Sequence, residues 1–247
     1  MKSASALFDF LNLRNTRHMC GRFTNQYTWR ELVDLYRITE PYIHPISNLE
    51  PRFNFAPMQR GLVVRLDKEG RREPAIMRWG LVPSWAKDDK DGARCINAKA
   101  ETVAEKPAYR AAFKARPCLV VADGFYEWAP VGVGRKQPYF ITTKGRAPFA
   151  FAGLWEWWRA KDAPKDEPGL ESFTILTTEP NELCAPIHNR MPVILAPEDW
   201  PKWLGTPDDR KTLLRTYPAE RMECWPVGKA VGNVRNEGPE MIEKIEA

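Results

Sequence analysis

The chain has 247 residues, of which 43% are hydrophobic and 28% are charged, and this is enough apolar side chain for one substantial core. Its formal charge of +5 falls to +3 without residues 1–19, which carry three basic residues and one acidic residue, so charge alone points to no particular partner. Five widely spaced cysteines without a Cys-x-x-Cys pair argue against a zinc finger or a disulfide framework, and no apolar run approaches the roughly 18 residues of a membrane span.

The first 18 residues show neither helical nor strand periodicity. They also lack the long apolar stretch and the small-residue cleavage site of a secretory signal. Met19 follows them as a second possible start of translation. We therefore expect residues 1–19 to be a mis-assigned start or a removable leader, and removal of Met19 would leave Cys20 at the N-terminus.

An N-terminal Cys20 would carry an α-amine and a thiol on one residue. The amine has a pKa of about 8 and the thiol a pKa of about 8.5, so both nucleophilic forms exist at physiological pH. An aldehyde would form an imine with the amine, and the thiolate would close it into a thiazolidine ring. The alternative interpretation is that Cys20 is a small, buried and inert residue behind a chance methionine.

The first half of the chain predicts one clear helix and one hairpin. Thr28 and Glu31 have capping-box spacing, and the apolar residues after them recur on one face of a helix that ends before Pro41. Residues 61–66 and 74–79 are β-rich runs on either side of a turn, which predicts a hairpin.

The rest of the chain is dominated by β-strand patterns. A short helix is predicted over residues 107–115, strands over residues 118–121, 137–143, 149–155, 172–178 and 192–195, a charged loop over residues 159–171, and helical patterns over residues 197–204 and 208–217. The 22 prolines interrupt most of these runs. Short strands with irregular connections are therefore favoured over a doubly wound sheet.

Few side chains are placed for acid–base chemistry. His188 is the best placed of three histidines, in a polar break before an apolar strand, although a hydrogen-bonded loop histidine would look the same. Glu127 lies among aromatic residues at the end of an apolar strand, where burial would raise its pKa unless it faces outward. Asn97, Lys99 and Glu101 alternate and would share one strand face, as they also would on a solvated edge.

Tryptophan is abundant, with ten residues, and most of these are expected in the core. Tryptophans beside basic residues also form surfaces on which unpaired bases stack. Arg22, Lys99 and Arg190 could contact phosphates, although an isolated cation is more often simply solvated. No Gly-x-Ser-x-Gly, His-Glu-x-x-His, Gly-x-Gly-x-x-Gly or Walker pattern is present, which disfavours the common hydrolase, zincin and nucleotide-binding classes.

Seven short motifs occur in order along the chain: MCGRF, NFAP, WGLVPSW, NAKAET, GFYEW, FAGLWE and His-x-Arg-Met-Pro. In this combination the chain resembles the SOS response-associated peptidase (SRAP) family over nearly its whole length. The resemblance implies an α+β fold, with one domain over residues 20–234 that has a barrel-like, mostly antiparallel β-core and peripheral short helices. Residues 235–247 would form a polar C-terminal tail.

The resemblance also implies a function. A positively charged groove would bind single-stranded DNA, and the N-terminal Cys20 would form a covalent crosslink that shields an abasic site. Cys20 would attack the aldehyde of the ring-opened sugar, and Asn97 would position the cysteine or the sugar. Glu127 would shuttle protons during ring opening and imine formation, and His188 would act as acid or base near the sugar and assist ring closure or reversal.

A second set of positions matches the family's DNA-binding residues: Arg22, Asn54, Lys99 and Arg190 with polar or charged groups, and Trp79 and Trp128 with aromatic surfaces near the bases. Lys99 stands where the family often has arginine, so the charge is kept but bidentate geometry is lost. No metal or cofactor is implied. The expected partner is single-stranded DNA with abasic sites, bound by a monomer without membrane contact in the cytoplasm, or at the nucleoid in a bacterium.

Two other classes of function stay open at this point. A thiol peptidase would use Cys20 with His188 and either Glu127 or Asn97, and it would explain loss of residues 1–19 by self-cleavage. A non-catalytic binder of single-stranded nucleic acid would need the aromatic and basic residues but not Cys20. Lyase activity by β-elimination could also accompany the crosslinking reaction.

Overall fold

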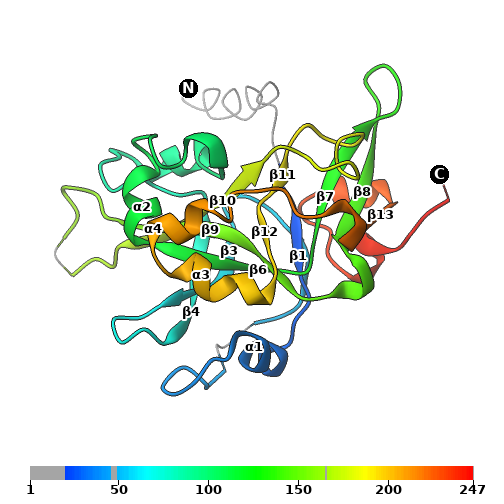
Figure 1. Cartoon of the computed structure of the whole chain (residues 1–247). Coiled ribbons are helices and arrows are strands. Elements are labelled where there is room, and N and C mark those ends of the chain that lie inside the picture. Colours follow the sequence, from blue (N-terminus) through cyan, green and yellow to red (C-terminus); the bar gives the residue numbers. More distant parts are fainter. Residues whose placement is uncertain (1–19, 46–48, 165, 247) are drawn as a thin grey trace, which may run out of the picture.

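The structure is a computed structural model that describes residues 20–45, 49–164 and 166–246. The predicted leader lies outside the described residues. The described strands are β1 (Phe23–Asn25), β2 (Arg52–Phe55), β3 (Arg60–Leu66), β4 (Arg72–Trp79), β5 (Asn97–Lys99), β6 (Pro117–Ala122), β7 (Gly124–Pro130), β8 (Lys136–Thr143), β9 (Phe149–Trp158), β10 (Leu170–Thr178), β11 (Met191–Pro192), β12 (Ile194–Leu195) and β13 (Met222–Pro226). They form two sheets with short helices at the periphery (Figure 1).

The helices of the described residues are all short. The α-helices are α1 (Trp29–Tyr36), α2 (Arg110–Ala115), α3 (Trp200–Leu204) and α4 (Pro207–Lys211). The 3₁₀ helices are η2 (Asp89–Arg94), η3 (Ala100–Thr102), η4 (Lys144–Arg146), η5 (Pro197–Asp199), η6 (Ala219–Arg221), η7 (Lys229–Gly232) and η8 (Pro239–Ile242). None of the helices in the described part of the chain has the length and apolar character needed to cross a membrane.

Five strands close into a barrel. Their order is β10–β4–β3–β6–β9, and the pairing of β9 with β10 completes the ring. The pairs are antiparallel except β4–β10, and β5 adds a further parallel pairing to β10. The predicted α+β fold with a barrel-like, mostly antiparallel core is therefore confirmed.

The second sheet has the order β13–β8–β7–β1–β2, and all its pairings are antiparallel. Its strand β7 pairs on one side with β8, where Glu127 faces Tyr139, and on the other side with β1, where Phe125 faces Phe23. Because β1 begins three residues after Cys20, this pairing brings Cys20 to the side of β7.

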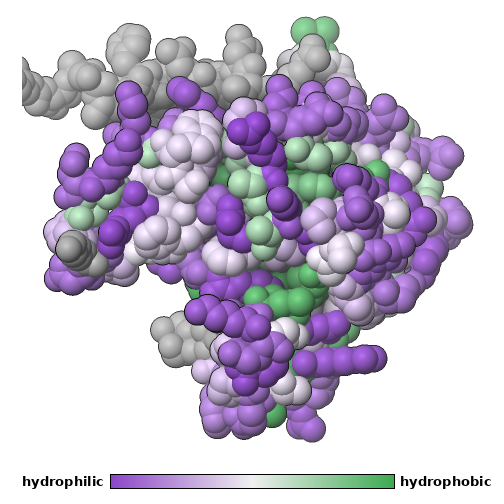
Figure 2. Space-filling view, turned by 60° about the vertical axis from the view of Figure 1, so that its left-hand side comes forward, coloured by the Kyte–Doolittle hydropathy of each residue, from purple (hydrophilic) through white to green (hydrophobic). Residues whose placement is uncertain are grey.

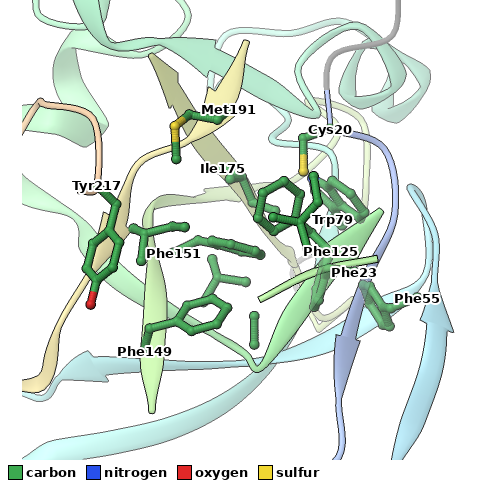
Figure 3. Close-up of a cluster of buried hydrophobic side chains, with 14 of the residues drawn as sticks. Cys20, Phe23, Phe55, Trp79, Phe125, Phe149, Phe151, Ile175, Met191 and Tyr217 are labelled. Carbon is green, nitrogen blue, oxygen red and sulfur yellow. The ribbon is translucent and has the colours of Figure 1, made fainter. Parts of the chain in front are cut away.

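Strand alternation divides the core into layers. Val63 and Val120 belong to one buried cluster that also contains Cys20, Phe23 and Phe125, so this cluster joins the barrel to the second sheet (Figure 3). The neighbours of those valines along β3 and β6 belong to a second cluster, which includes residues of α1, α2 and α3. Polar residues cover most of the face drawn in Figure 2, with apolar side chains gathered near its middle.

Local patterns predicted several elements well. The capping box of Thr28 and Glu31 is formed at the start of α1, and the predicted hairpin is β3–β4. Other boundaries differ: α2 begins only at Arg110, the pattern at 208–217 yields only the five residues of α4, and the run at 192–195 belongs to two separate two-residue strands.

The C-terminal residues pack against the second sheet. Met241 is 5% exposed, and the Trp225 indole donates to the Ile242 carbonyl at 2.8 Å. Val227 and Lys244 form an antiparallel bridge. The division into leader, domain and polar tail stays a prediction, but the described residues after 234 make contacts that a free tail would not.

Candidate functional site around Cys20

Cys20 is held through both ends of its backbone. Its nitrogen donates to Glu127 Oε1 at 2.6 Å, and its carbonyl accepts from Asn97 Nδ2 at 3.1 Å. The residue itself has no exposed surface. The segment before β1 and the strands β5 and β7 thus bring three of the predicted catalytic residues together.

His188 completes this group from the loop between β10 and β11. Its Nδ1 lies 3.9 Å from Glu127 Oε1 and accepts from the Arg190 backbone N–H at 3.2 Å. A neutral ring with its proton on Nε2 satisfies that hydrogen bond. All four residues predicted as catalytic are therefore neighbours in the fold, although they are up to 168 positions apart in the chain.

Burial controls the protonation of these groups. It raises the pKa of Glu127 to about 8, against the opposing effects of the Cys20 N–H and of the Lys136 charge. Burial also lowers the pKa of His188 and raises the pKa of the Cys20 thiol, the latter reinforced by the charge of Glu127. At neutral pH the site thus combines a mostly protonated carboxyl with a neutral imidazole and a protonated thiol.

The position of Glu127 determines what the site can do chemically. Its oxygen contacts the nitrogen of Cys20, and within the described residues no hydrogen bond joins the His188 ring to the Cys20 sulfur. A carboxyl with a pKa near neutrality can both give and accept a proton. The arrangement is therefore suited to proton transfer at the nitrogen of Cys20.

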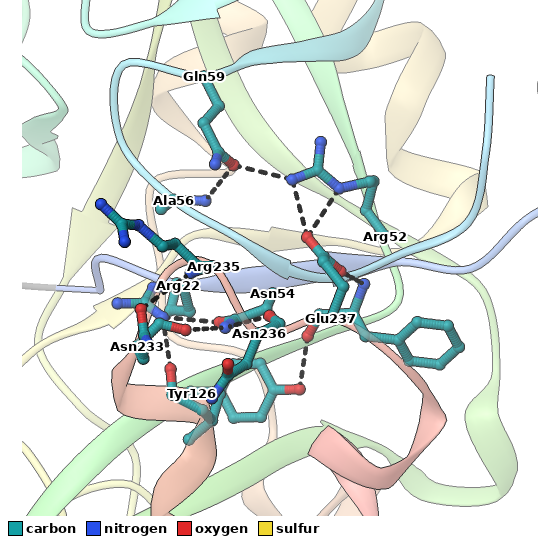
Figure 4. Close-up of polar contacts among 12 residues, drawn as sticks. Arg22, Arg52, Asn54, Ala56, Gln59, Tyr126, Asn233, Arg235, Asn236 and Glu237 are labelled. Carbon is teal, nitrogen blue, oxygen red and sulfur yellow. Dashed lines mark hydrogen bonds and ion pairs between the residues drawn. The ribbon is translucent and has the colours of Figure 1, made fainter. Parts of the chain in front are cut away.

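Arg22 and Trp128 lie next to this group. The Arg22 guanidinium lies over the Trp128 ring at 5.7 Å from its centroid, and it donates to Asn54 Oδ1 at 2.6 Å (Figure 4). Trp128 is partly exposed, whereas Asn54 has no exposed surface. Asn54 therefore reaches Arg22 but presents no surface of its own to a ligand.

The other predicted DNA-binding residues are spread more widely. Lys99 is exposed at the end of β5, two positions after Asn97. Arg190 makes two hydrogen bonds to the Glu101 carboxylate, at 2.6 and 2.9 Å, and a third to the Thr177 carbonyl at 2.6 Å. The alternation predicted that Glu101 shares a strand face with Asn97 and Lys99, and this is wrong. Strand β5 ends at Lys99, and Glu101 lies in the 3₁₀ helix η3.

Trp79 differs from its predicted role. It has no exposed surface, its indole donates to the Ile96 carbonyl at 2.8 Å, and its ring packs against Phe23 and Phe173 with centroids 5.1 and 6.4 Å away. A nucleobase cannot stack on a ring that has no exposed surface, so Trp79 is a core residue.

Two neighbours of the site had no signal in the sequence. Lys136, on β8, is exposed, and its charge lowers the pKa of both Glu127 and His188. Cys184 belongs to the same buried cluster as Cys20. Over the described residues, no group of three or more His, Cys, Asp or Glu side chains is arranged to hold a metal ion.

The closed barrel with a cysteine fixed between a carboxyl and an amide defines a single-domain protein with a cysteine-centred site. The family model described as "SOS response associated peptidase (SRAP)" matches residues 19–234, and the chain belongs to this family.

Named relatives agree with this assignment, and a solved structure shares the fold. The chain is 41% identical over 229 residues to the "Abasic site processing protein YoqW" of Bacillus subtilis (strain 168), covering 91% of this chain and 99% of that protein. It is 34% identical over 228 residues to the "Abasic site processing protein HMCES" of Gallus gallus, covering 79% and 67%. A crystal structure of a protein from Bacteroides thetaiotaomicron shares the fold, with a TM-score of 0.80 at 24% identity over 92% of this chain and 100% of that chain.

Proposed function

We propose that this protein acts on abasic sites in single-stranded DNA and forms a covalent thiazolidine crosslink through Cys20, which shields the lesion. Relatives at 31–41% identity are named abasic site processing proteins, which supports the choice of substrate. The observation that carries the proposal is the contact of 2.6 Å between Glu127 Oε1 and the Cys20 nitrogen. Once residues 1–19 are absent, that nitrogen is an amine beside a carboxyl.

The reaction consists of two additions with loss of one water. The Cys20 amine attacks the aldehyde carbon of the opened sugar and forms a hemiaminal. Glu127 donates its proton to the departing hydroxyl, which leaves as water, and an iminium remains. The Cys20 thiol then adds to the iminium carbon, the π electrons return to nitrogen, and the thiol proton is released to water, from which the Glu127 carboxylate is protonated again.

The other two residues prepare these steps. His188 is neutral because burial lowers its pKa, and with Nδ1 bonded to the Arg190 N–H its Nε2–H can donate to the ring oxygen of the closed sugar and assist ring opening. The hydrogen bond from Asn97 to the Cys20 carbonyl fixes the direction in which the nitrogen and sulfur point. Arg22 and Lys99 provide positive charge for the phosphates on either side of the lesion, whereas the charge of Arg190 is already paired with Glu101.

The same contact favours this chemistry over a thiol peptidase. A peptidase nucleophile needs a base at its sulfur or a lowered thiol pKa, whereas burial raises the pKa of Cys20 and the carboxyl lies at its nitrogen. A passive nucleic-acid binder would give no role to a carboxyl at that position.

The proposal is tested by intact mass spectrometry of protein expressed from Met19. The expected starting mass lacks methionine, and incubation with a single-stranded oligonucleotide that carries one abasic site adds the oligonucleotide mass minus one water. Cys20→Ser should give no heat-stable adduct, whereas Cys95→Ser, at a partly buried cysteine elsewhere, should react normally.

Two controls separate the alternatives. An oligonucleotide whose abasic aldehyde has been reduced to the alcohol should give no adduct, since no imine can form. Protein that retains residues 1–19 should also be unreactive, because its Cys20 nitrogen is a peptide nitrogen. An adduct with Cys20→Ser, or no adduct with an N-terminal Cys20, would overturn the proposal.

A further inference from the structure

Arg22 is a buried cation whose partners are all neutral. Arg22 is 9% exposed. Its Nη1 donates to Asn54 Oδ1 at 2.6 Å and to the Val231 carbonyl at 2.5 Å. Its buried Nε has no hydrogen-bond partner, and no ion pair is formed by Arg22 with any described residue. The charge of Glu237 acts on Arg22 from a distance, but Glu237 pairs with Arg52 and makes no ion pair with Arg22. A desolvated charge without an anion in contact is costly, so the site gains from an anionic ligand.

Asn54 has its orientation fixed from behind. Its Nδ2 donates to the carbonyls of Asn233 and Asn236, at 3.0 and 2.8 Å. A flipped amide would place its oxygen against those two carbonyls, so the Oδ1 atom must face Arg22. The amide therefore supplies an acceptor for the guanidinium without cancelling its charge, which a carboxylate at this position would do.

The carbonyls that fix Asn54 come from residues 231–237, which we name the C-terminal strap. Glu237 at its end accepts from Arg52 Nε at 2.8 Å and from the Phe53 backbone N–H at 2.9 Å. The strap is thereby tied to β2, the strand that carries Asn54 (Figure 4). One ion pair at the surface thus anchors a chain of contacts that ends at Arg22, two residues from Cys20.

We propose that Asn54 and the C-terminal strap form a positioning unit that holds Arg22, with its charge intact, for a phosphate of the bound DNA. Asn54 is a positioning residue in this assignment and does not contact the DNA. The inference rests on the proposed function only in taking a DNA phosphate as the ligand of Arg22.

The first experiment is a double-mutant cycle on the affinity for an undamaged single-stranded oligonucleotide, measured between low and moderate salt. Each phosphate contact contributes about 0.7 to the slope of log affinity against log salt concentration. Arg22→Gln should lower the slope by about 0.7. Asn54→Asp should lower it equally, because the new carboxylate neutralises Arg22, and the double variant should lose no more than either single variant.

A purely structural role of Asn54 predicts a different result. Asn54→Asp would then lower the melting temperature but leave the salt slope of the folded protein unchanged, or the two losses would add. Either result would overturn the inference. Binding is measured well below the melting temperature of each variant, with near-ultraviolet circular dichroism of the buried tryptophans as the check on folding.

A second pair of variants covers the case in which Asn54→Asp does not fold. Glu237→Gln loosens the anchor of the strap and should weaken DNA binding about threefold, the effect of losing one exposed ion pair. Glu171→Gln is the matched control, since Glu171 also pairs with an arginine and its side chain is 31% exposed against 36% for Glu237. Removal of a negative charge alone should strengthen binding to a polyanion, so a loss specific to Glu237→Gln identifies positioning.

The outcomes also separate this inference from the proposed function. If wild-type affinity does not depend on salt or on Arg22, the DNA-binding function itself fails. If wild type and Arg22→Gln behave as expected but Asn54→Asp and Glu237→Gln match wild type, only the positioning unit is wrong.

Discussion

Replacing Glu127 by glutamine should change how the stability of the protein depends on pH. The carboxyl has a pKa of about 8 in the folded chain, against an ordinary value of 4.5, because it is buried. Between these values the folded state keeps a proton that the unfolded state releases. The free energy of unfolding should therefore fall with rising pH, by about 1.36 kcal/mol per pH unit from this group alone.

Glutamine keeps an oxygen that accepts from the Cys20 N–H but cannot ionise. The variant should lack the contribution of Glu127 to the slope, so its stability relative to wild type should rise by about 2.7 kcal/mol between pH 5.5 and pH 7.5. Burial disfavours the ionised carboxylate, so the folded wild type loses stability as the pH rises towards 8. Relative to Glu127→Gln, wild type is therefore more stable at pH 5.5 than at pH 7.5.

The assay is urea unfolding of both proteins at the two pH values, with the slope of each transition checked for equality. The pH-dependent change in the free energy of unfolding of the variant is compared with that of wild type, so the contributions of all other titrating groups cancel. Parallel stability curves for wild type and Glu127→Gln would refute the argument, because they would show that Glu127 is ionised in the folded protein at pH 5.5.

Two further predictions follow from packing and charge. Gly124→Ala should destabilise the fold by about 3 kcal/mol, because the added Cβ would lie 2.1 Å from the Phe140 ring. Gly228→Ala is the control: nothing lies within 4 Å of its added Cβ, so it should leave the thermal melt nearly unchanged. Equal losses of stability in the two variants would contradict the packing argument. Arg190→Gln should raise the pKa of Glu101, which the guanidinium now lowers, and a carboxyl titration followed by NMR that stays at its wild-type value would show that the pair is not formed in solution.

The sequence was most informative where a local rule determines local structure. The capping box predicted the start of α1, and the period-two runs predicted the β3–β4 hairpin. The two-residue strands β11 and β12 and the three-residue strands β1 and β5 have too few residues for any periodicity, and they exist because longer strands beside them offer free hydrogen-bonding edges.

The four residues predicted as catalytic lie together in the fold, but how they contact one another was not predictable from the sequence. The motifs identified Cys20, Asn97, Glu127 and His188, but no property of the sequence shows that Glu127 contacts the nitrogen of Cys20. Trp79 illustrates the opposite error, since a tryptophan near basic residues has the same local pattern whether its ring is exposed or, as here, buried against Phe23. Such differences depend on long-range pairing of strands.

Strand β7 shows how one short motif serves both parts of the site. Successive residues of a strand face opposite sides of the sheet. Phe125 and Glu127 face the cluster that contains Cys20, while Tyr126 and Trp128 face the cluster that the C-terminal residues cover. The first face places a buried carboxyl at the nitrogen of Cys20, and the second supplies the ring beneath Arg22 and a hydroxyl that bonds to β2 at 2.7 Å. Cys20 and Arg22 both depend on contacts with this strand, so a change in the register of β7 would disturb the Glu127–Cys20 and Trp128–Arg22 contacts together.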